Sequence, residues 1–587
     1  MGKAYDSRLM KRLLTYMKPY RWQVVLAVLL MLVATALDLL MPYLTKIALD
    51  NYIIPHDAQG LLHIVWLFIW VLVFQFFFQI SQAYLLQWIG QKVLYDLRIK
   101  LFRHMQRLSL SFFDKNPVGR LVTRVTTDVE TLNELFSAGI VAIFGDIFLL
   151  AGIIIVLLKI NSTLALITFS VLPVLFYITI VFRKYVREGF RQIRVRIAKI
   201  NAYLQENISG MLIVQLFNRE KKNFKKFDVL NADHLEAYIR TIVYFAIFFP
   251  AVELISAIAV ALIVWYGGMN FNSGAVTIGT LVAFIQYARR FFRPISDLSE
   301  KYNILQAAMA SSERIFKILD TVPDIKNPEA PWEVINFRGH IEFDHVWFSY
   351  KKDEEDWVLR DVSFQVLPGE KIAFVGATGA GKTTIISLLC RFYDVQRGSI
   401  TIDGVDIREY DIHFLRSHFG IVLQDVFLFA GDIETNIRLS NTAMPREQII
   451  KAAKDVNLDP FIRQLPNQYQ EEVKERGSTL SMGQRQLLSF ARALASNPHI
   501  LILDEATSSV DTETELLIQD ALKTLMEGRT SIIIAHRLST IVNSDRILVM
   551  HKGKIRETGT HRELLTQKGI YHRLYQLQYK GENQVSS

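Results

Sequence analysis

Long apolar runs separated by charged stretches fill the first 300 residues of the chain. Six of these runs lie at residues 24–44, 61–88, 138–158, 164–182, 242–266 and from 276 to beyond 293. Several reach the roughly 20 residues that an α-helix needs to cross the hydrocarbon core of a bilayer. A buried helix of a soluble protein rarely stays apolar over such a length. The pattern therefore predicts six membrane-spanning helices.

The charged stretches predict how these helices are oriented. Residues 91–136 contain eight Lys or Arg and residues 183–239 contain twelve, whereas the short connections after the first, third and fifth apolar runs contain very few. Because positively charged loops stay in the cytoplasm, we expect both long loops, and with them both termini, on the cytoplasmic side. Both loops have a helical pattern, so the spanning helices should continue beyond the membrane. Residues 1–21 mix basic and apolar side chains, which is typical of a helix lying on the membrane surface.

The pattern changes after the last apolar run. Pro323, Pro328 and Pro331 interrupt residues 321–338, which we interpret as a linker. Beyond it, apolar strands alternate with helical segments, which indicates a mostly parallel sheet. We therefore divide the chain into a transmembrane domain (1–320), the linker (321–338), an α/β domain (339–580) and a polar tail (581–587).

Composition narrows the classes of function. The formal net charge is +9, but the basic residues gather between the apolar runs, where membrane topology accounts for them. We therefore expect no nucleic-acid partner. The single cysteine, Cys390, excludes an intrachain disulfide and a metal cluster built from several cysteines.

One strand of the expected sheet runs directly into a glycine-rich loop. Residues 371–375 are followed by Gly-Ala-Thr-Gly-Ala-Gly-Lys-Thr at 376–383. Glycines in this pattern let the backbone curl until its N–H groups face a phosphate at the positive end of the next helix. Lys382 would reach the β- and γ-phosphates, and the Thr383 hydroxyl would bind Mg²⁺. The sequence thus predicts a site for ATP and Mg²⁺.

A second apolar strand, residues 500–503, ends in two acidic residues. Asp504 at a strand end suits a magnesium site, and Glu505 beside it is placed to polarise an attacking water as general base. Gln424 follows another apolar strand, and His536 follows a third. A single histidine after a strand usually has a structural role, but this one ends the next strand of the expected nucleotide-binding sheet.

These motifs, in this order and with Ser-Met-Gly-Gln at 481–484, resemble those of the ATP-binding cassette (ABC) superfamily. Six spans ahead of one cassette resemble the half-transporter arrangement of exporters, so the resemblance covers essentially the whole chain. It implies an α-helical six-span transmembrane domain of the type IV exporter kind, followed by an α/β P-loop nucleotide-binding domain. The protein would then be an ATP hydrolase coupled to transport, integral to the cell membrane, multi-pass, with its nucleotide-binding domain in the cytoplasm.

The resemblance also implies a role for each residue that matches a family motif. For binding ATP, these are Tyr350, which stacks on adenine, and Gly376, Thr378, Gly379, Gly381, Lys382, Thr383 and Thr384. For Mg²⁺ they are Thr383, Gln424 and Asp504, and for hydrolysis Glu505, His536 and Gln424. The signature that closes over another subunit's nucleotide consists of Ser481, Gly483 and Gln484, and Asp511 belongs to the loop at the dimer interface.

The signature requires a second half-transporter, because one cassette holds ATP on a single face. ATP binding would join the two cassettes, and hydrolysis would release them. The loops near 111–119 and 209–218 are expected to act as coupling helices that transmit this closure to the spans. The family's usual signature has two adjacent glycines, whereas Met482 here restricts the backbone and adds bulk near phosphate. Either a homodimer tolerates this methionine or the chain forms a heterodimer with unequal sites, and we favour the heterodimer.

The sequences of the predicted spans contain less information about the transported molecule. The ionisable residues expected at membrane depth are Asp38, Asp146, Glu253, Arg289 and Arg290. The arginines either lie at the cytoplasmic interface or line an inward-facing cavity that attracts anionic or amphipathic headgroups. Aromatic residues such as Phe284 and Tyr287 either face such a cavity or pack against lipid.

Three functions fit these observations. The first is ATP-driven export of amphipathic or hydrophobic compounds of the multidrug type, by alternating access in a dimer. The second is flipping of a lipid or lipid-linked substrate. The third, from another class, is a non-pumping ATP-gated regulator or channel, against which the intact Glu505 and His536 argue. The expected partners are a second half-transporter, membrane lipids and a small amphipathic substrate.

Overall fold

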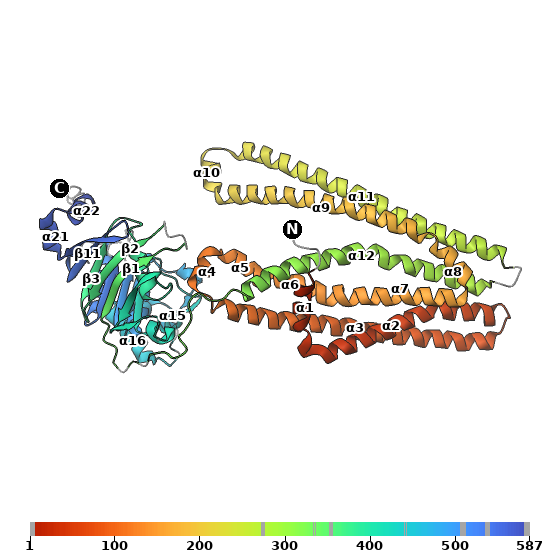
Figure 1. Ribbon diagram of the computed structural model, residues 1–587, viewed down its shortest axis with the longest axis horizontal. Helices are drawn as coiled ribbons and strands as arrows, with labels where there is room; N and C mark the ends of the chain where they lie inside the picture. Colours follow the sequence, from red (N-terminus) through yellow and green to blue (C-terminus); the bar gives the residue numbers. More distant parts are fainter. Residues whose placement is uncertain are drawn as a thin grey trace. The chain divides into compact units, whose positions relative to one another are not determined.

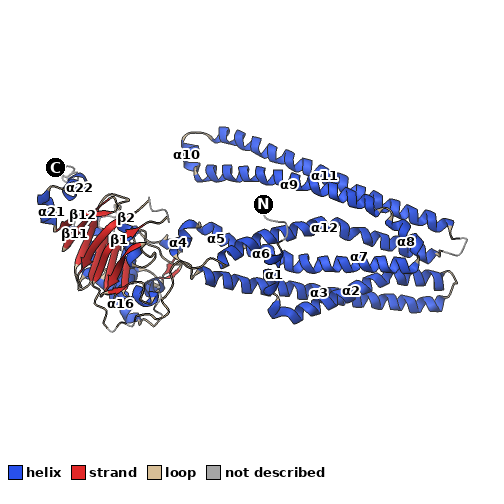
Figure 2. Cartoon of the chain, viewed as in Figure 1, coloured by secondary structure: helices blue, strands red, loops and turns tan. Residues whose placement is uncertain are grey.

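The chain forms two compact units. The computed structural model describes residues 6–579 apart from 272–275, 333, 335, 352–355, 440, 442, 505–511 and 535–540. The first unit, residues up to Gln106 together with Val118–Thr321, is helical, and the second combines helices with strands (Figures 1 and 2). The second unit contains Arg107–Pro117 as well as the residues from Val322 onward. Residues 107–117, which belong to the first of the two long loops of the expected transmembrane domain, thus pack with the second unit.

The first unit follows the apolar pattern of the sequence. Its α-helices are α1 (Ser7–Thr15), α2 (Arg21–Ile47), α3 (Ala58–Met105), α5 (Val118–Val125), α6 (Thr127–Glu134), α7 (Ile140–Ile160), α8 (Ser162–Phe169), α9 (Leu172–Ser209), α10 (Met211–Leu216), α11 (Glu220–Met269) and α12 (Ile278–Leu319). Among the described residues, five helical stretches are long and apolar enough to cross a membrane: Lys18–Ile53, Ala58–Met105, Val118–Ile160, Ser162–Ser209 and Glu220–Met269. The sixth expected span lies in α12, which is not among these five.

Several of these helices are much longer than a membrane is thick. Helix α3 has 48 residues and α11 has 50, so at about 1.5 Å per residue each exceeds a hydrocarbon core of about 30 Å more than twofold. Helices α9 and α11 lie side by side as a long arm that ends in α10 (Figure 1). Leu212 and Leu216 on α10 are 76% and 68% exposed. The tip of this arm thus presents exposed apolar side chains.

Aromatic residues of the sixth apolar run lie inside the helical unit. Phe284 and Tyr287 are fully buried in a core formed with side chains of α7, α8, α9 and α11. Phe284 lies in this core and lines no cavity among the described residues, contrary to both sequence-based alternatives, whereas Tyr287 also lines a cavity that is described below. Trp66 and Phe77 on α3 are instead 57% and 61% exposed, as expected of a surface that meets lipid or another subunit.

The second unit contains three sheets. A six-stranded sheet has the order β12-β11-β3-β10-β9-β6, with strands β3 (Lys371–Val375), β6 (Phe419–Val422), β9 (Ile500–Asp504), β10 (Thr530–Ile534), β11 (Arg546–His551) and β12 (Lys554–Gly559). All its pairings are parallel except that of β11 with β12. An antiparallel sheet has the order β2-β1-β4-β5, with β1 (Ile341–Phe348), β2 (Leu359–Val366), β4 (Arg397–Ile402) and β5 (Val405–Asp406). Strands β7 (Gly431–Asp432) and β8 (Glu472–Val473) form a short pair.

Helices cover both faces of the six-stranded sheet. The helices described in the second unit are α4 (Leu110–Lys115), α13 (Lys382–Leu389), α14 (Ile412–Ser417), α15 (Ile433–Arg438), α16 (Arg446–Asp455), α17 (Asp459–Gln464), α18 (Met482–Ala495), α19 (Thr512–Met526), α21 (His561–Gln567) and α22 (Ile570–Tyr579). Successive side chains of a strand point to opposite faces, so Phe374 joins the core that includes α13, while Val375 joins the core that includes α18. Because β3 and α13 are both anchored in this way, the loop between them is held at its two ends.

Candidate functional site

The loop between β3 and α13 has a backbone that suits glycine. A Cβ atom at Gly376 would lie 2.3 Å from the carbonyl oxygen of Met550, which is closer than real contacts allow. Gly379 and Gly381 have φ values of 80° and 104°, in the region that side chains rarely adopt. Any larger residue at these positions would move the loop away from the strand and the helix that it joins.

The Lys382 side chain folds back into this loop. Its Nζ atom donates hydrogen bonds to the carbonyl oxygens of Gly376 at 2.7 Å and Ala377 at 3.2 Å. Burial lowers the pKa of Lys382, although the nearby Asp504 carboxylate opposes this effect. The ammonium group thus donates to two backbone carbonyls and lies near one carboxylate, and a phosphate would stabilise it further. A curled backbone at a helix N-terminus around a buried ammonium fits the phosphates of a nucleotide.

Residues expected to bind Mg²⁺ gather at one edge of the sheet. Asp504 ends β9 and is 9% exposed, while Gln424 lies two residues beyond β6. Strands β3, β10, β9 and β6 are parallel, so their carboxyl ends meet at the edge where α13 begins, and the side chain of Thr383 in its first turn is exposed. Hard oxygen ligands from a hydroxyl, an amide and a carboxylate suit Mg²⁺. The donor set thus fits the metal that the sequence predicts.

Three predicted functional residues lie outside the part of the chain that the structure describes. They are Glu505, Asp511 and His536. Strands β9 and β10, which precede Glu505 and His536, end at the same edge of the sheet as β3. Their roles in hydrolysis and at the dimer interface stay predictions.

Tyr350, which the family resemblance predicts to stack on adenine, lies beside the start of α13. Its hydroxyl group is 3.2 Å from the Thr384 hydroxyl, and its side chain is 44% exposed. Its ring packs edge-on against Phe348 at 4.9 Å and against Tyr393 at 5.1 Å. The ring is thus fixed in place with part of its surface open, while Thr378 in the loop is exposed as well.

Helix α4 is held against this part of the second unit by three hydrogen bonds. The Tyr393 hydroxyl donates to Asp114, the Ser111 hydroxyl donates to Asp324 at 2.5 Å, and the backbone N–H of Ile325 donates to the Ser109 hydroxyl at 3.0 Å. Burial and the neighbouring Asp114 carboxylate raise the pKa of Tyr393, so this hydroxyl keeps its proton at neutral pH.

Asp114 and Tyr393 were not among the residues predicted to be functional. The sequence indicates that residues 111–119 couple the two domains, but it contains no signal for the partner of that loop. Tyr393 also contacts the Tyr350 ring. A loop between membrane helices is therefore connected to Tyr350, the residue expected to stack on adenine, through one tyrosine.

The signature begins helix α18. The Ser481 hydroxyl accepts a hydrogen bond from the backbone N–H of Gln484 at 3.2 Å, and the Gln484 side-chain oxygen accepts one from the N–H of Ser481 at 2.9 Å. This reciprocal pair is a capping box. Met482 follows in helical conformation without a positive φ, so the expected restriction of its backbone has no effect here. Its side chain is 46% exposed beside the buried Gly483, which leaves added bulk as the difference from glycine.

The structure brings some of the predicted substrate-pathway residues together. Arg290 forms an ion pair of 2.9 Å with Asp38, while Asp146 pairs with Lys301, a residue that was not predicted. Asp38 and Asp146 line one cavity of about 220 Å³, together with Gln79, Gln82, Thr35 and apolar side chains. Glu253 and Arg289 are exposed on α11 and α12 and belong to neither pair.

The contact between Arg290 and Asp38 is explained by an interruption in helix α2. Pro42 lies inside α2 and has no N–H, so it leaves the Asp38 carbonyl four residues earlier without its helical hydrogen bond. The Arg290 guanidinium donates to that carbonyl as well as to the Asp38 carboxylate, and Gln75 donates to the carboxylate at 3.1 Å. The arginine thus repairs the interruption in α2, which neither sequence-based interpretation of this residue includes.

Comparison with known proteins agrees with this arrangement. Residues 24–295 match the family described as ABC transporter transmembrane region, and residues 359–508 match the family described as ABC transporter. The "Probable multidrug resistance ABC transporter ATP-binding/permease protein YheH" of Bacillus subtilis is 39% identical over 92% of this chain and 80% of that protein. The "ATP-dependent lipid A-core flippase" of Syntrophus aciditrophicus is 38% identical over 97% of this chain and 94% of that protein.

A solved structure has the same fold. The structure of a bacterial Atm1-family ABC exporter with ATP bound superposes with a TM-score of 0.78 at 29% identity, covering 95% of this chain and 98% of that one. These matches confirm an ATPase coupled to export, a multi-pass membrane protein with a cytoplasmic nucleotide-binding domain, and a half-transporter that functions as a dimer. The chain belongs to the ABC transporter family, as an exporter half-transporter in which a helical transmembrane domain precedes the nucleotide-binding domain.

Proposed function

We propose that this protein exports small amphipathic compounds, as one subunit of a dimer that alternates access to the two sides of the membrane. The observation that carries the proposal is the cavity of about 220 Å³ that contains Asp38, Asp146 and two glutamines. Each acid in it is paired with a base, so the cavity is polar without a large net charge. Apolar side chains such as Met31 and Leu149 complete its wall. A compound with both polar and apolar surface suits such a lining.

ATP is expected to bind together with Mg²⁺. The buried Lys382 ammonium exchanges its contacts with loop carbonyls for contacts with phosphate, and the Tyr350 ring orients the base. Thr383, Gln424 and Asp504 would hold Mg²⁺, which neutralises charge on the phosphates when bound. Glu505 takes a proton from the attacking water, and His536 contacts the terminal phosphate, as the family resemblance implies. Ser481 and Gln484 complete the site of the other subunit.

A heterodimer is the proposed assembly. Met482 stands at the place where the family's usual signature has glycine, so the site to which this chain contributes its signature is more crowded than a usual site. The exposed apolar side chains at the tip of α10, Leu212 and Leu216 with Phe217 after them, are suited to dock on the nucleotide-binding unit of a partner.

Uptake into inside-out vesicles tests the export function. Vesicles that contain the chain with a co-expressed related half-transporter should accumulate a fluorescent lipophilic cation when ATP and Mg²⁺ are added. Glu505→Gln is the matched control, because it should keep ATP binding and abolish uptake. Absence of ATP-dependent uptake from vesicles that hydrolyse ATP would refute export of such compounds. ATPase stimulation by one lipid headgroup alone would indicate a lipid flippase instead.

The same preparation tests the assembly. The chain purified alone should show weak ATPase activity that increases several-fold with its partner. Full substrate-stimulated activity of the isolated chain would rule out the heterodimer and leave the homodimer.

A further inference from the structure

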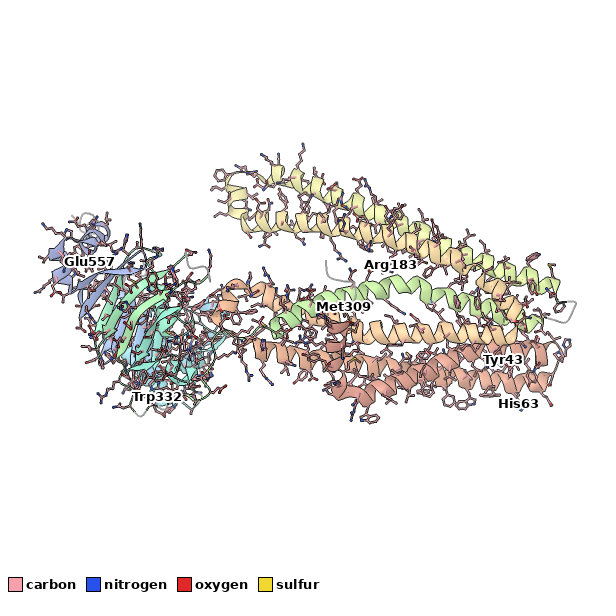
Figure 3. All side chains as sticks on the ribbon, viewed as in Figure 1. Tyr43, His63, Arg183, Met309, Trp332 and Glu557 are labelled. Atoms are coloured by element: carbon pink, nitrogen blue, oxygen red, sulfur yellow. The ribbon has the colours of Figure 1, made fainter. Side chains whose placement is uncertain are left out.

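A second cavity lies at the outer end of the helical unit. It has a volume of about 530 Å³ and is enclosed by α2, α7 and α12. Tyr43, which lines it, lies with His63 at the end of this unit where α2 joins α3, the opposite end from α10 (Figures 1 and 3). Because the long loops of this multi-pass protein are on the cytoplasmic side, the cavity lies in the outer half of the membrane. It is separate from the cavity that contains Asp38 and Asp146.

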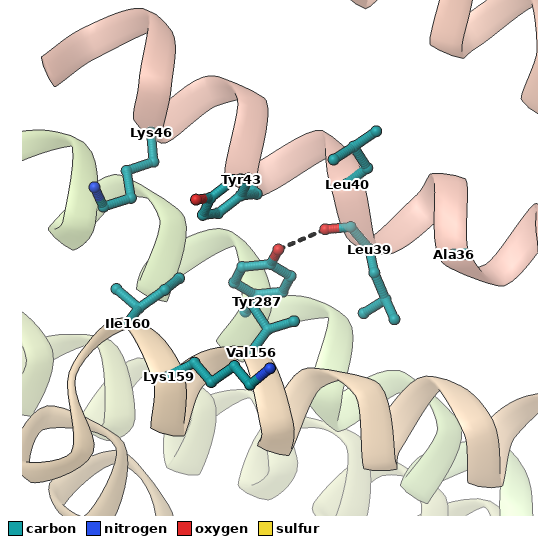
Figure 4. Close-up of a pocket in the computed structure, with 9 residues that line it drawn as sticks. All are labelled: Ala36, Leu39, Leu40, Tyr43, Lys46, Val156, Lys159, Ile160 and Tyr287. Atoms are coloured by element: carbon teal, nitrogen blue, oxygen red, sulfur yellow. Dashed lines mark hydrogen bonds between the residues drawn. The ribbon is translucent and has the colours of Figure 1, made fainter. Parts of the chain in front are cut away.

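The lining of this cavity has two positive charges. Lys46 enters it from α2 and Lys159 from α7, on opposite sides of the Tyr43 and Tyr287 rings (Figure 4). The lining residues include no aspartate or glutamate. The Tyr287 hydroxyl is already engaged, because it donates to the carbonyl oxygen of Leu39 at 2.5 Å.

One acidic residue lies beside this lining. Asp50 is 3.1 Å from the Lys46 ammonium, but it also accepts hydrogen bonds from the Thr277 hydroxyl at 2.6 Å and the Gly279 N–H at 2.8 Å. Asp50 is therefore shared among three donors, and it caps the start of α12 as well as pairing with Lys46. Lys159 is exposed, and among the described residues no ion pair involves it. The charge around the cavity remains positive.

The lining of the cavity is charged at its outer end and apolar toward the middle of the membrane, as are the headgroups and acyl chains of a lipid leaflet. Both lysines lie at the outer end, whereas Leu39 and Ala36 lie farther toward the middle of the membrane on α2. Ten residues separate Ala36 from Lys46, which corresponds to about 15 Å along a helix. This is about half the thickness of a hydrocarbon core. Long cationic side chains at this depth extend toward the headgroup region.

We propose that this cavity binds an anionic phospholipid of the outer leaflet. Its phosphate lies near the Lys46 ammonium and the Tyr43 hydroxyl, Lys159 adds positive charge from α7, and one acyl chain follows α2 toward Ala36. The volume suits part of such a lipid, since ligand cavities commonly measure about 300 to 1,000 Å³. The bound lipid joins α2, α7 and α12 at their outer ends, whichever compound the protein exports.

Lipid retention by the purified full-length protein tests this site. Native mass spectrometry, after titration with phosphatidylglycerol or phosphatidylcholine, should show tighter binding of phosphatidylglycerol. Each lysine near an anionic headgroup contributes about fivefold in affinity, so Lys46→Gln with Lys159→Gln should weaken phosphatidylglycerol binding about 25-fold. The matched control is Lys221→Gln with Lys222→Gln, which removes the same charge from an exposed part of α11 and should change binding less than twofold.

A second variant distinguishes a specific binding cavity from non-specific electrostatic attraction between the lysines and lipid headgroups. Ala36→Phe narrows the inner end of the cavity and keeps both lysines, so it should also reduce phosphatidylglycerol binding. Three results would overturn the proposal: equal affinity for the two lipids, unchanged affinity in the Lys46/Lys159 variant, or unchanged affinity in Ala36→Phe. The unfolding temperature of each variant is measured first, and binding is compared only among variants that unfold at the same temperature as the parent. A loss of binding is then not confused with a loss of folding.

Discussion

Replacing Tyr393 by phenylalanine removes one hydroxyl group from the contact between α4 and the nucleotide-binding domain. The ring stays, so the packing against Tyr350 and Phe348 is preserved. What disappears is the hydrogen bond to Asp114. If α4 transmits the state of the nucleotide site to the membrane helices, this change should weaken coupling and leave ATP binding nearly intact.

The magnitude follows from the environment of the bond. A hydrogen bond to a charged acceptor contributes about 1.5 to 3 kcal/mol when it is shielded from solvent. Asp114 is exposed, so water competes for it and we take about 1 kcal/mol. The raised pKa of Tyr393 means that the proton is present throughout the neutral range, so pH does not alter this value there. About 1 kcal/mol corresponds to about a fivefold change in an equilibrium.

The assay compares basal with substrate-stimulated ATPase activity of the dimer in lipid vesicles. Tyr393→Phe should reduce stimulation about fivefold and change the KM for ATP less than twofold. Asp114→Asn should have a smaller effect in the same direction, because an amide oxygen still accepts the bond. Unchanged stimulation would refute a coupling role for this contact. An equal loss of basal activity and ATP affinity would show that the ring, rather than the hydroxyl, had been disturbed.

Three further predictions concern other parts of the chain. Lys382→Ala should weaken binding of a fluorescent ATP analogue about 30- to 150-fold, because a buried charge-assisted contact contributes about 2 to 3 kcal/mol. Binding within threefold of the parent would contradict its role. Arg290→Met should lower the free energy of unfolding by about 2 kcal/mol, because it leaves the Asp38 carbonyl without a partner and the Asp38 carboxylate with Gln75 alone. Adding Pro42→Ala should restore part of this loss in thermal unfolding, and no rescue would argue against helix repair. Burial raises the pKa of Cys390 to about 12, so a maleimide at pH 7.5 should label it only after unfolding, and rapid labelling of native protein would show that this core opens.

Local patterns were sufficient for much of the architecture. The apolar runs predicted the spans because membrane helices must be apolar over a length set by the bilayer. The glycine loop after β3 was predictable because its neighbours in sequence are also its neighbours in space. Residues 107–117 were assigned to the transmembrane domain, since sequence order alone places them between α3 and α5, but they fold with the second unit.

The side-chain pairs were not predictable from one sequence. Asp146 and Lys301 are 155 positions apart, and Tyr393 and Asp114 are 279 apart. Nothing local to either residue of such a pair identifies the other. Arg290 illustrates the same difficulty, because its role depends on the N–H group that Pro42 lacks in a different helix. The sequence predicts that Phe284 and Tyr287 face lipid or a cavity, because an aromatic side chain suits either environment. Only the packing of neighbouring helices shows that they lie in a core.

The capping box at the start of α18 affects the entropy cost of bringing two nucleotide-binding domains together. The Ser481 oxygen and the Gln484 side-chain oxygen accept bonds within their own turn, so the hydroxyl hydrogen and the amide NH₂ group remain as donors. Both side chains are already in fixed rotamers before a partner arrives. Immobilising such a side chain costs about 0.5 to 1.5 kcal/mol, and here that loss occurs when the domain folds, not when the nucleotide sandwich forms. The signature is therefore pre-organised for the contact with a second subunit that the family resemblance predicts.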